Sequence, residues 1–256
     1  MATSARADGP ISQAAQLLRR ARYAVALTGA GISTPSGIPD FRSPDTGLWE
    51  RADPMCVASI YAFRRDPESF YNWIRPLART LFQAQPNPGH RALATLESSD
   101  LLRAVITQNI DALHQHAGSK EVLEIHGHLR SATCIDCYRA QPTEDLMADF
   151  VESEGVPRCP ECGGVLKPDV VLFGEQLPVR VLNATRAHVR AADLMLIAGS
   201  SLEVTPVSQL PLKLYRRGGR LIVVNLTPTC ADSVADVVIR DDVAEVLPRI
   251  AQACIG

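Results

Sequence analysis

Four of the seven cysteines of this chain stand in two pairs with the spacing of metal ligands. The pairs are Cys134-x-x-Cys137 and Cys159-x-x-Cys162, with 21 residues between them. A two-residue gap lets both thiolates of a pair face one ion, and two pairs complete the tetrahedral four-sulfur shell that zinc prefers. Such a closed shell leaves no position for water, so we expect one structural zinc ion. Two disulfides or four unrelated thiols are the alternatives, and a reducing compartment disfavours disulfides.

A glycine-rich turn follows a strand-like apolar run near the N-terminus. The run from Tyr23 leads into Gly29-Ala-Gly31, where missing side chains let backbone N–H groups approach a pyrophosphate. The third glycine of the usual dinucleotide motif is replaced by Thr34, and the prolines that follow exclude an immediate long helix. Residues 37–43 then bring an acid, an aromatic ring and a base together. This pattern indicates a dinucleotide site, with a polar surface loop as the alternative.

Polar residues also follow three later apolar runs. The first run ends in Thr107-Gln-Asn-Ile-Asp111, and two others end in Ala198-Gly-Ser-Ser-Leu202 and Val224-Asn225. Open α/β sheets bind ligands beyond the carboxyl ends of their strands, where such side chains would meet. Helix capping by Asn109 or Asp111 is the alternative interpretation.

His126-Gly127-His128 stands just before the cysteine-containing segment. A histidine that follows a strand and precedes a glycine is expected to face a cleft. With an ordinary pKa near 6.5, His126 is a plausible general base near neutral pH. A His-x-His metal pair is the competing hypothesis, weakened because no carboxylate or third histidine lies nearby in the sequence.

Taken together, these motifs resemble those of the sirtuin family of NAD-dependent protein lysine deacylases. The resemblance extends from Ala21 to Val246. The matching motifs, in the family's order, are Gly29-Ala-Gly-Ile-Ser33, Gly37-Ile-Pro-Asp-Phe-Arg42, Gln108-Asn-Ile-Asp111, His126-Gly127, the four paired cysteines, Gly199-Ser-Ser201 and Asn225.

The resemblance implies an α/β fold with a Rossmann-like parallel-sheet domain that binds NAD. A smaller inserted domain would consist of a helical module and a four-cysteine zinc ribbon. The larger domain would comprise residues 1–40, 86–128 and 168–256, and the smaller one residues 41–85 and 129–167. NAD and an acetyl-lysine protein or peptide would enter the cleft between them from opposite sides.

The resemblance also assigns residues to each ligand. His126 would be the base that activates a ribose hydroxyl, and Asn109 would take part in catalysis as well as in NAD binding. The other NAD contacts would come from Gly29, Ala30, Gly31, Ile32, Asp40, Phe41, Arg42, Gln108, Ile110, Asp111, Gly199, Ser200, Ser201 and Asn225. The peptide would add as a strand to the segment that contains Val170, Val171, Phe173, Gly174 and Glu175.

The activity implied is NAD-dependent protein lysine deacetylation, in which the acetyl group passes to ADP-ribose and nicotinamide is released. Two departures from the family pattern bear on it. His128 stands where the family more often has a small or amide residue, and it could perturb the titration of His126. Tyr71 is followed by Ile74 where members that prefer succinyl or malonyl groups have arginine. A buried acyl carboxylate would lack its partner there, so we expect neutral acyl groups.

Strand-like runs that alternate with helical patterns are expected to position these motifs in a mainly parallel sheet. The runs are Tyr23–Leu27, Ala104–Thr107, Val122–Ile125, Val170–Phe173, Leu194–Ala198 and Leu221–Asn225. Asp66-Pro67 and Asn87-Pro88 predict two helix starts, each with a capping side chain before a proline. The segment between His126 and Asp169 is too short to fold by apolar burial alone, and the cysteines supply the cross-link that it needs.

The composition, with 46% hydrophobic and 21% charged residues among 256, is typical of a globular protein. No apolar run approaches the roughly 20 residues of a membrane span. The N-terminus lacks the apolar region of a secretory signal, so we expect a cytoplasmic protein without membrane contact. A formal net charge of −2 provides no overall basic field, and direct nucleic-acid binding is not expected.

Three other functions would use parts of the same pattern. Mono-ADP-ribosyl transfer to a protein would use the same NAD site with a different acceptor. A nucleic-acid or protein docking module would rely on the cysteine pairs, but it would leave the polar strand ends unexplained. A dehydrogenase is disfavoured because the third glycine of the usual dinucleotide motif is missing.

Overall fold

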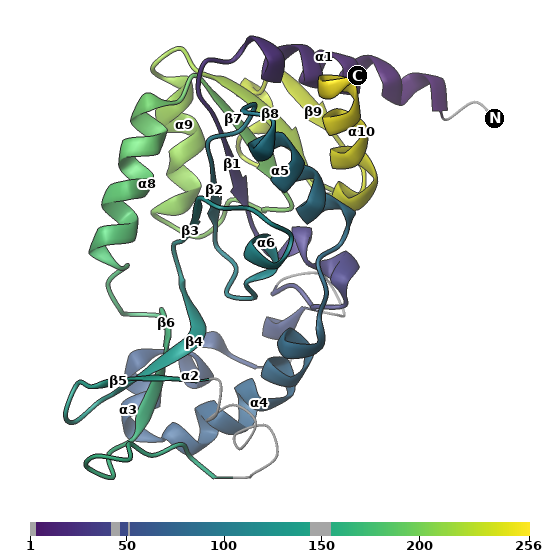
Figure 1. Ribbon diagram of the computed structural model, residues 1–256. Helices are drawn as coiled ribbons and strands as arrows, with labels where there is room; N and C mark the ends of the chain where they lie inside the picture. Colours follow the sequence, from purple (N-terminus) through teal and green to yellow (C-terminus); the bar gives the residue numbers. More distant parts are fainter. Residues whose placement is uncertain (1–3, 42–46, 51, 144–154) are drawn as a thin grey trace.

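The computed structural model describes residues 4–41, 47–50, 52–143 and 155–256 (Figure 1). Its larger sheet has six parallel strands in the order β3-β2-β1-β7-β8-β9. The strands are β1 (Ala24–Thr28), β2 (Ala104–Thr107), β3 (Val122–Glu124), β7 (Leu194–Ala198), β8 (Arg220–Val224) and β9 (Val237–Ile239).

The central strands of this sheet are apolar along their whole length because both of its faces are covered. Every residue of β1, β2 and β7 is buried. From β1 the chain proceeds to β2 and β3 on one side, and from β7 to β8 and β9 on the other. The direction of winding therefore reverses between β1 and β7, which is where open α/β sheets place their ligands.

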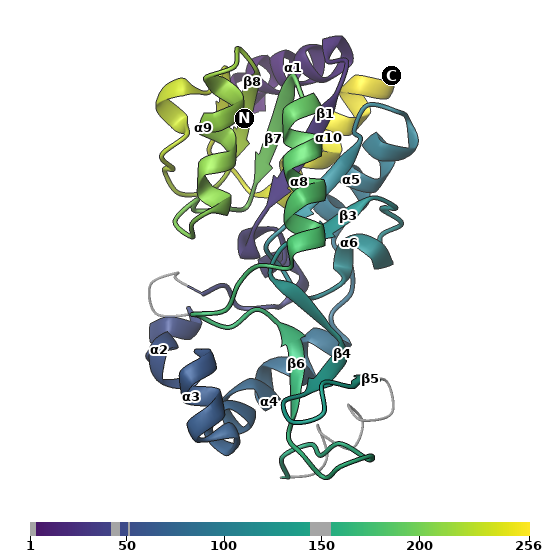
Figure 2. The same ribbon diagram turned by 90° about the vertical axis from the view of Figure 1, so that its left-hand side faces the viewer.

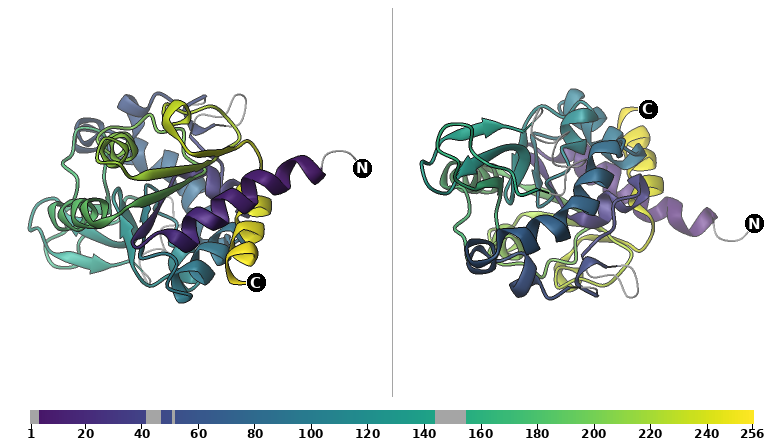
Figure 3. Two further views of the ribbon diagram at one scale, coloured as in Figure 1. Left: turned by 90° about the horizontal axis from the view of Figure 1, so that it is seen from above. Right: turned by 90° about the horizontal axis from the view of Figure 1, so that it is seen from below.

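Helices pack on both faces of the six-stranded sheet (Figures 1 and 3). One face is covered by α1 (Ser4–Arg20), α5 (Pro88–Ser98) and α10 (Val243–Ile255), whose apolar stripes form one buried cluster with the strands. The other face is covered by α8 (Val179–Ala191), η4 (Val207–Gln209) and α9 (Leu210–Tyr215). Asn87 caps α5 by accepting from the N–H groups of Gly89 and His90, as the Asn-Pro signal predicts.

A second, antiparallel sheet has three strands in the order β5-β4-β6 and lies beyond one end of the first (Figure 2). Its strands are β4 (Gly127–Cys134), β5 (Ala140–Pro142) and β6 (Leu166–Val170), and beside them lie α2 (Pro54–Val57), α3 (Ile60–Arg65) and α4 (Pro67–Gln83). Phe63, Phe70 and Tyr71 pack edge to face in the core of this region. Asp66 caps α4, as predicted.

The other described elements are short and belong to the loops. They are η1 (Ala30–Ile32), η2 (Thr34–Ser36), η3 (Leu48–Glu50), α6 (Leu113–His116) and η5 (Asp232–Val234). The 3₁₀ turns η1 and η2 stand where the prolines exclude a long helix. Within the described ranges, no helix has the length and apolarity needed to cross a bilayer.

The predicted α/β fold and the predicted parallel sheet are confirmed, but the strand predicted at Val170–Phe173 is wrong. The strand is Leu166–Val170, and it belongs to the antiparallel sheet. Beyond it, Phe173 bridges to Ser59, so this apolar run is buried against the start of α3 instead of in a ladder. The strand Gly127–Cys134 was not predicted because its residues do not form an apolar run.

Candidate active site

The turns that follow β1 and β7 lie against each other at the point of reversal. The Gly29 N–H donates to the Ala198 carbonyl (3.4 Å), and the Gly31 N–H donates to the Gly199 carbonyl (2.9 Å). A Cβ atom on either Gly29 or Gly31 would lie 2.9 Å from the Gly199 oxygen. Glycine is therefore needed for backbone contact between two turns. The N–H groups of Gly29 and Gly31 thus form hydrogen bonds within the protein, whereas the sequence predicts that they face a pyrophosphate.

The segment after β2 joins these turns through its amide side chains. Gln108 Nε2 donates to Ser200 Oγ at 2.9 Å. Asn109 Nδ2 donates to the Gly29 carbonyl at 3.1 Å and to Ser33 Oγ at 3.0 Å. The ends of β1, β2 and β7 are thus connected by polar contacts, and the predicted residues from three separate motifs meet in one place.

Ser33 fixes the position of the Asp111 carboxylate. Its hydroxyl donates to Asp111 Oδ2 at 2.7 Å, and the Leu113 N–H donates to Asp111 Oδ1 at 2.9 Å. Burial raises the pKa of Asp111, and the two hydrogen bonds oppose that rise. Asn109 and Asp111 are nearly inaccessible, with 8% and 9% exposure. A buried cluster of amide, hydroxyl and carboxylate groups can form hydrogen bonds with the ribose hydroxyls and the carboxamide of a nicotinamide nucleotide. The polar groups of such a ligand would complete the hydrogen bonding of the cluster.

Two buried histidines lie beneath this cluster. The His90 ring accepts at Nδ1 from the Asn87 N–H (3.4 Å), so its Nε2 carries the proton that faces Ser33 Oγ at 3.4 Å. Burial lowers the pKa of His90 to about 4. The His114 ring lies 4.9 Å from it, bonds Thr28 Oγ1 through Nε2 at 2.9 Å, and has its pKa lowered well below the ordinary value, again by burial. Both histidines are therefore neutral at pH 7.

His126 stands at the junction between the two sheets. Its Nδ1 lies 3.1 Å from the Gln108 carbonyl oxygen, which only accepts, so Nδ1 carries the proton and the lone pair is on Nε2. A neutral imidazole in this tautomer is ready to accept a proton. His128, two residues along β4, has a buried Nδ1 without a hydrogen-bond partner among the described residues.

The other residues predicted to contact NAD follow β1, β2 and β7 in the chain. Phe41 stacks on Trp49 at 5.1 Å between ring centroids, and Trp49 stacks on Trp73 at 5.5 Å, which ties the segment after η2 to α4. Arg42 lies outside the described residues. Ile32 is buried, and the half-buried residues of this set are Ala30, Asp40, Phe41, Ile110 and Ser201.

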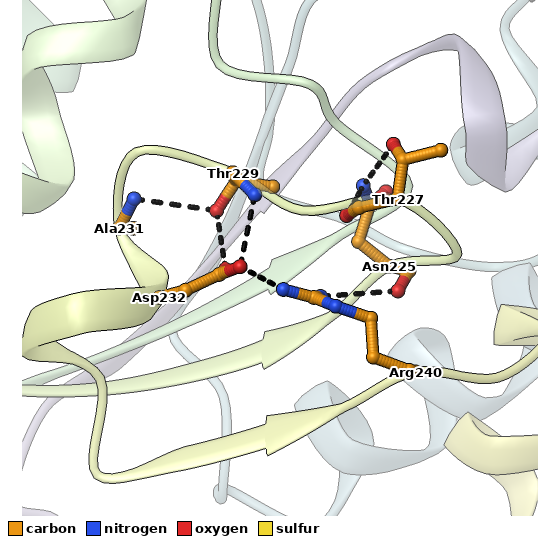
Figure 4. A network of polar contacts seen from close by, with 6 residues as sticks. All are labelled: Asn225, Thr227, Thr229, Ala231, Asp232 and Arg240. Carbon is orange, nitrogen blue, oxygen red and sulfur yellow. Dashed lines mark hydrogen bonds and ion pairs between the residues drawn. The ribbon is translucent and has the colours of Figure 1, made fainter.

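Asn225 follows β8 and begins a loop held by its own hydrogen bonds (Figure 4). Its Nδ2 donates to the Thr227 carbonyl at 2.8 Å, and the Arg240 guanidinium donates to the Asn225 carbonyl at 3.2 Å. Arg240 also pairs with Asp232, whose carboxylate accepts from the N–H and the hydroxyl of Thr229. The start and the end of this loop are thereby held by one arginine side chain at the carboxyl end of the sheet.

The predicted peptide segment runs from β6 past His126 to α3. The Val171 N–H donates to the His126 carbonyl at 2.8 Å. Phe173 donates to the Ala58 carbonyl at 2.9 Å and accepts from the Ile60 N–H at 3.0 Å. An added strand would therefore have to use other backbone groups of this segment.

Glu175 anchors the end of that segment. Its carboxylate accepts from the Leu172 N–H at 2.8 Å and from Lys167 Nζ at 3.1 Å. Lys167 also donates to the Val170 carbonyl at 3.0 Å. Val170 and Glu175 thus hold the segment in shape, next to the exposed Gly174.

The four paired cysteines form a separate cluster at the end of the small sheet. All four sulfur atoms lie within 4.8 Å of one another, and none is in a disulfide. Sγ–Sγ distances of 3.5 Å (Cys134 to Cys162) and 3.7 Å (Cys137 to Cys159) agree with the ~3.8 Å edge of a tetrahedron with Zn–S bonds of about 2.3 Å. Gly164 is required beside them, because a Cβ there would lie 2.9 Å from the sulfur of Cys134. The donor set fits zinc.

Sequence reasoning left Ser33, His90 and His114 out of the predicted site. Ser33 is the last residue of the matched motif Gly29-Ala-Gly-Ile-Ser33, so the motif could have identified it as a site residue. The two histidines lie on apolar helix faces, where histidine has no distinctive spacing. Only the packing of α5 and α6 against the turn after β1 brings them to Ser33 and Thr28.

Comparison with known proteins gives matches over most of the chain. The Sir2 family model matches residues 29–206. An NAD-dependent protein deacetylase of Sulfurisphaera tokodaii is 48% identical over 91% of this chain and 92% of its own. NAD-dependent protein deacylase 2 of Archaeoglobus fulgidus is 45% identical over 96% of each. A solved Sir2 complex with a p53 peptide and NAD+ has a TM-score of 0.84 and 42% identity, covering 93% of this chain and 95% of that one.

Proposed function

The chain belongs to the Sir2 family and is an NAD-dependent protein deacetylase, and we propose that His126 is its general base. The single observation that carries this assignment is the hydrogen bond from His126 Nδ1 to the Gln108 carbonyl, which leaves the proton-accepting lone pair on Nε2. When bound, NAD supplies the glycosidic bond that breaks as nicotinamide leaves and the ribose that receives the acetyl group. His126 would hold the proton taken from a ribose hydroxyl.

We assign the orientation of NAD to the polar side chains at the strand ends. Asn109 and Asp111 are held by Ser33, so little conformational entropy is left for them to lose when NAD binds. Gln108 and Ser200 would contact the ligand from β2 and β7, and Asn225 would contact it from β8. Their burial supports this role because it keeps water from competing for the same groups.

An acetyl-lysine protein or peptide is the second substrate, and the family's complexes with peptides support this. We propose that the peptide pairs with the segment from Val170 to Glu175. Backbone pairing predicts that N-methylation of the residues next to the acetyl-lysine raises KM at least tenfold. N-methylation several residues away is the matched control, and an equal effect at both positions would contradict strand addition.

The decisive experiment compares wild type, His126→Ala and His116→Ala with an acetyl-lysine peptide and NAD, following nicotinamide release and peptide mass together. We expect wild type to remove the acetyl group, and His126→Ala to lower kcat/KM at least about 10²-fold. The exposed His116 is the matched control and should leave kcat/KM within twofold. Nicotinamide release with the acetyl group retained would instead favour ADP-ribosyl transfer.

We propose that neutral acyl groups are preferred over acidic ones. Ile74 is 4% exposed and packs with Phe63 and Phe70 in an apolar cluster, so a succinyl carboxylate near it would have no partner. The expected result is kcat/KM at least tenfold lower for a succinylated than for an acetylated peptide. Ile74→Arg should raise the succinyl-to-acetyl ratio, whereas Ile74→Met should not. An unchanged ratio in Ile74→Arg would contradict this mapping.

We further propose two structural units with the boundaries expected from the sequence: residues 1–40, 86–128 and 168–256 for the NAD unit, and 41–85 with 129–167 for the other. The two separate sheets support a division into two units, and the boundaries at 128/129 and 167/168 fall within β4 and β6 of the smaller sheet. We also propose a cytoplasmic location, because a four-thiolate zinc site requires reduced cysteines. Cell fractionation tests this location, and recovery in an oxidising compartment would contradict it.

A further inference from the structure

Helices α8 and α9 lie on the face of the six-stranded sheet opposite to α1, α5 and α10, as Figures 1 and 2 show. Residues of these helices and of the segments next to them line a groove. Its volume is about 390 Å³, within the range of small-molecule sites. None of its lining residues is among those assigned to NAD or to the peptide. Ile125 lines it, one residue before His126.

The uncharged lining of the groove is entirely aliphatic. It consists of Ile125, Leu182, Val189, Pro206, Val207 and Leu210. Ile125 and Val207 are almost completely buried, whereas Leu182 is half-buried on α8. The lining has no aromatic ring that could stack on a nucleobase and no neutral polar side chain that could form hydrogen bonds with one. The groove is therefore suited to a saturated alkyl chain.

Every charged side chain of the lining is basic. Arg186 and Arg190 come from α8 and Lys213 from α9, and Arg216 and Arg217 directly follow α9. In the part of the chain that the structure describes, the side chains of Arg186, Lys213 and Arg216 form no ion pair or hydrogen bond. The whole chain carries a formal net charge of −2, so the groove is a locally basic region of a slightly acidic protein.

Arg217 has a different part in the groove. Its guanidinium donates to the carbonyls of Val189 (3.2 Å) and Arg190 at the end of α8. This contact ties the end of α9 to α8 and fixes the width of the groove at that end. The apolar lining is thus held open by the protein itself.

We propose that this groove binds a free medium-chain fatty acid, with its alkyl chain on the aliphatic lining and its carboxylate at Arg186, Lys213 and Arg216. The half-buried Leu182 and the exposed Pro206 offer apolar surface to such a chain, and cations that form no ion pair among the described residues complement the anionic head. Nucleic acid would call for aromatic stacking surfaces, which the lining lacks.

The experiment is calorimetric titration of the full-length protein with butyrate, octanoate and decanoate below micelle-forming concentration. We expect saturable binding of one decanoate per chain. Affinity should rise about fourfold per added methylene while the chain still enters the groove. Decyltrimethylammonium, with the same chain and the opposite charge, should bind at least tenfold more weakly than decanoate.

Two variants and a control locate the site. Arg186→Gln with Lys213→Gln should weaken decanoate binding at least tenfold, and Leu182→Trp should block it by filling the groove. Arg180→Gln, on the same helix but outside the lining, should leave binding within twofold. Thermal melting and deacetylation of a peptide confirm that each variant is folded.

Three outcomes would overturn the proposal. Decanoate binding that is displaced by acetyl-lysine peptide and is unaffected by the groove variants would place the ligand in the catalytic channel. Equal binding of the ammonium surfactant would show that the basic residues do not select an anion. Binding to phosphatidylglycerol vesicles without saturable decanoate binding would assign this face to a lipid surface.

Discussion

At the scale of single residues, the candidate base depends on the residue that follows it. Gly127 has φ of +77°, and a Cβ atom there would lie 2.0 Å from the Asp169 carbonyl oxygen. The turn at Gly127 allows β4 to begin directly after His126 and to pair with β6. Gly127 thereby contributes to the position of the His126 ring next to the Gln108 carbonyl. The sequence marked this glycine only through the resemblance to a known motif, because a positive φ is not readable from one chain.

Gly127→Ala is expected to cost at least about 2 kcal/mol of stability and to reduce deacetylation more than tenfold, since both the left-handed backbone and the close contact are violated. Urea unfolding and peptide assays measure the two effects. Gly218→Ala is the matched control: its φ is +82°, but nothing lies within 4 Å of the added atom. Equal losses in both variants would mean that the contact with Asp169 is unimportant.

At the scale of elements, the loop after β8 owes its shape to one side chain from beyond β9. Arg240 joins the carbonyl of Asn225 to the carboxylate of Asp232, across the whole loop (Figure 4). Asn225 is predicted from the sequence to contact NAD, whereas no sequence motif points to Arg240. The pairing depends on the parallel register of β8 and β9, which places Val224 opposite Ile239.

Arg240→Gln should therefore raise KM for NAD by about three- to tenfold with a smaller change in kcat, because the loop loses its fixed shape while His126 is unaffected. Steady-state kinetics with varied NAD measures this. Arg220→Gln removes a comparable ion pair, with Asp236, at the opposite end of β8 and should leave KM within twofold. A fall in kcat alone for Arg240→Gln would contradict the positioning role.

The segment with the four paired cysteines, which we call the zinc ribbon, is expected to depend on its metal ion for stability. Below about 40 residues a segment lacks enough apolar surface to fold by itself, so the metal supplies folding energy there. Removing zinc with a chelator, or replacing Cys159 by Ser, should abolish hydrogen-exchange protection in β4, β5 and β6 and with it the deacetylation. Cys56→Ser, at an exposed thiol outside the four-cysteine cluster, is the control. Retained protection after complete zinc loss would rule out the structural assignment.

At the scale of the whole molecule, the buried histidines make stability depend on pH. With a pKa lowered to about 4 in the folded chain and near 6.5 when unfolded, His90 binds its proton more readily in the unfolded state. Stability is thus fully present above pH 6.5 and is lost as pH falls toward 4. His114 acts in the same direction, whereas the raised pKa of Asp111 partly opposes it.

Between pH 7 and pH 5 the free energy of unfolding should fall by about 2 kcal/mol from His90 alone. Urea unfolding at the two pH values measures the fall. His90→Asn should reduce this pH dependence even though it lowers stability at pH 7, while exposed His116→Gln should leave it unchanged. A pH dependence that is the same in wild type and His90→Asn would contradict the assignment.

From the sequence we predict the family, the parallel α/β fold, the four cysteines of the candidate metal site and most of the candidate active site. These depend on features that are local along the chain: residue spacing, apolar runs, and caps such as Asn87. Which residues are in contact depends on how distant segments pack in the folded chain. The strand at Leu166–Val170, the close approach of two glycine turns, and the histidines under Ser33 all join segments far apart in sequence. So does the basic groove between α8 and α9, because each helix contributes only part of it and the register of the sheet sets how they meet.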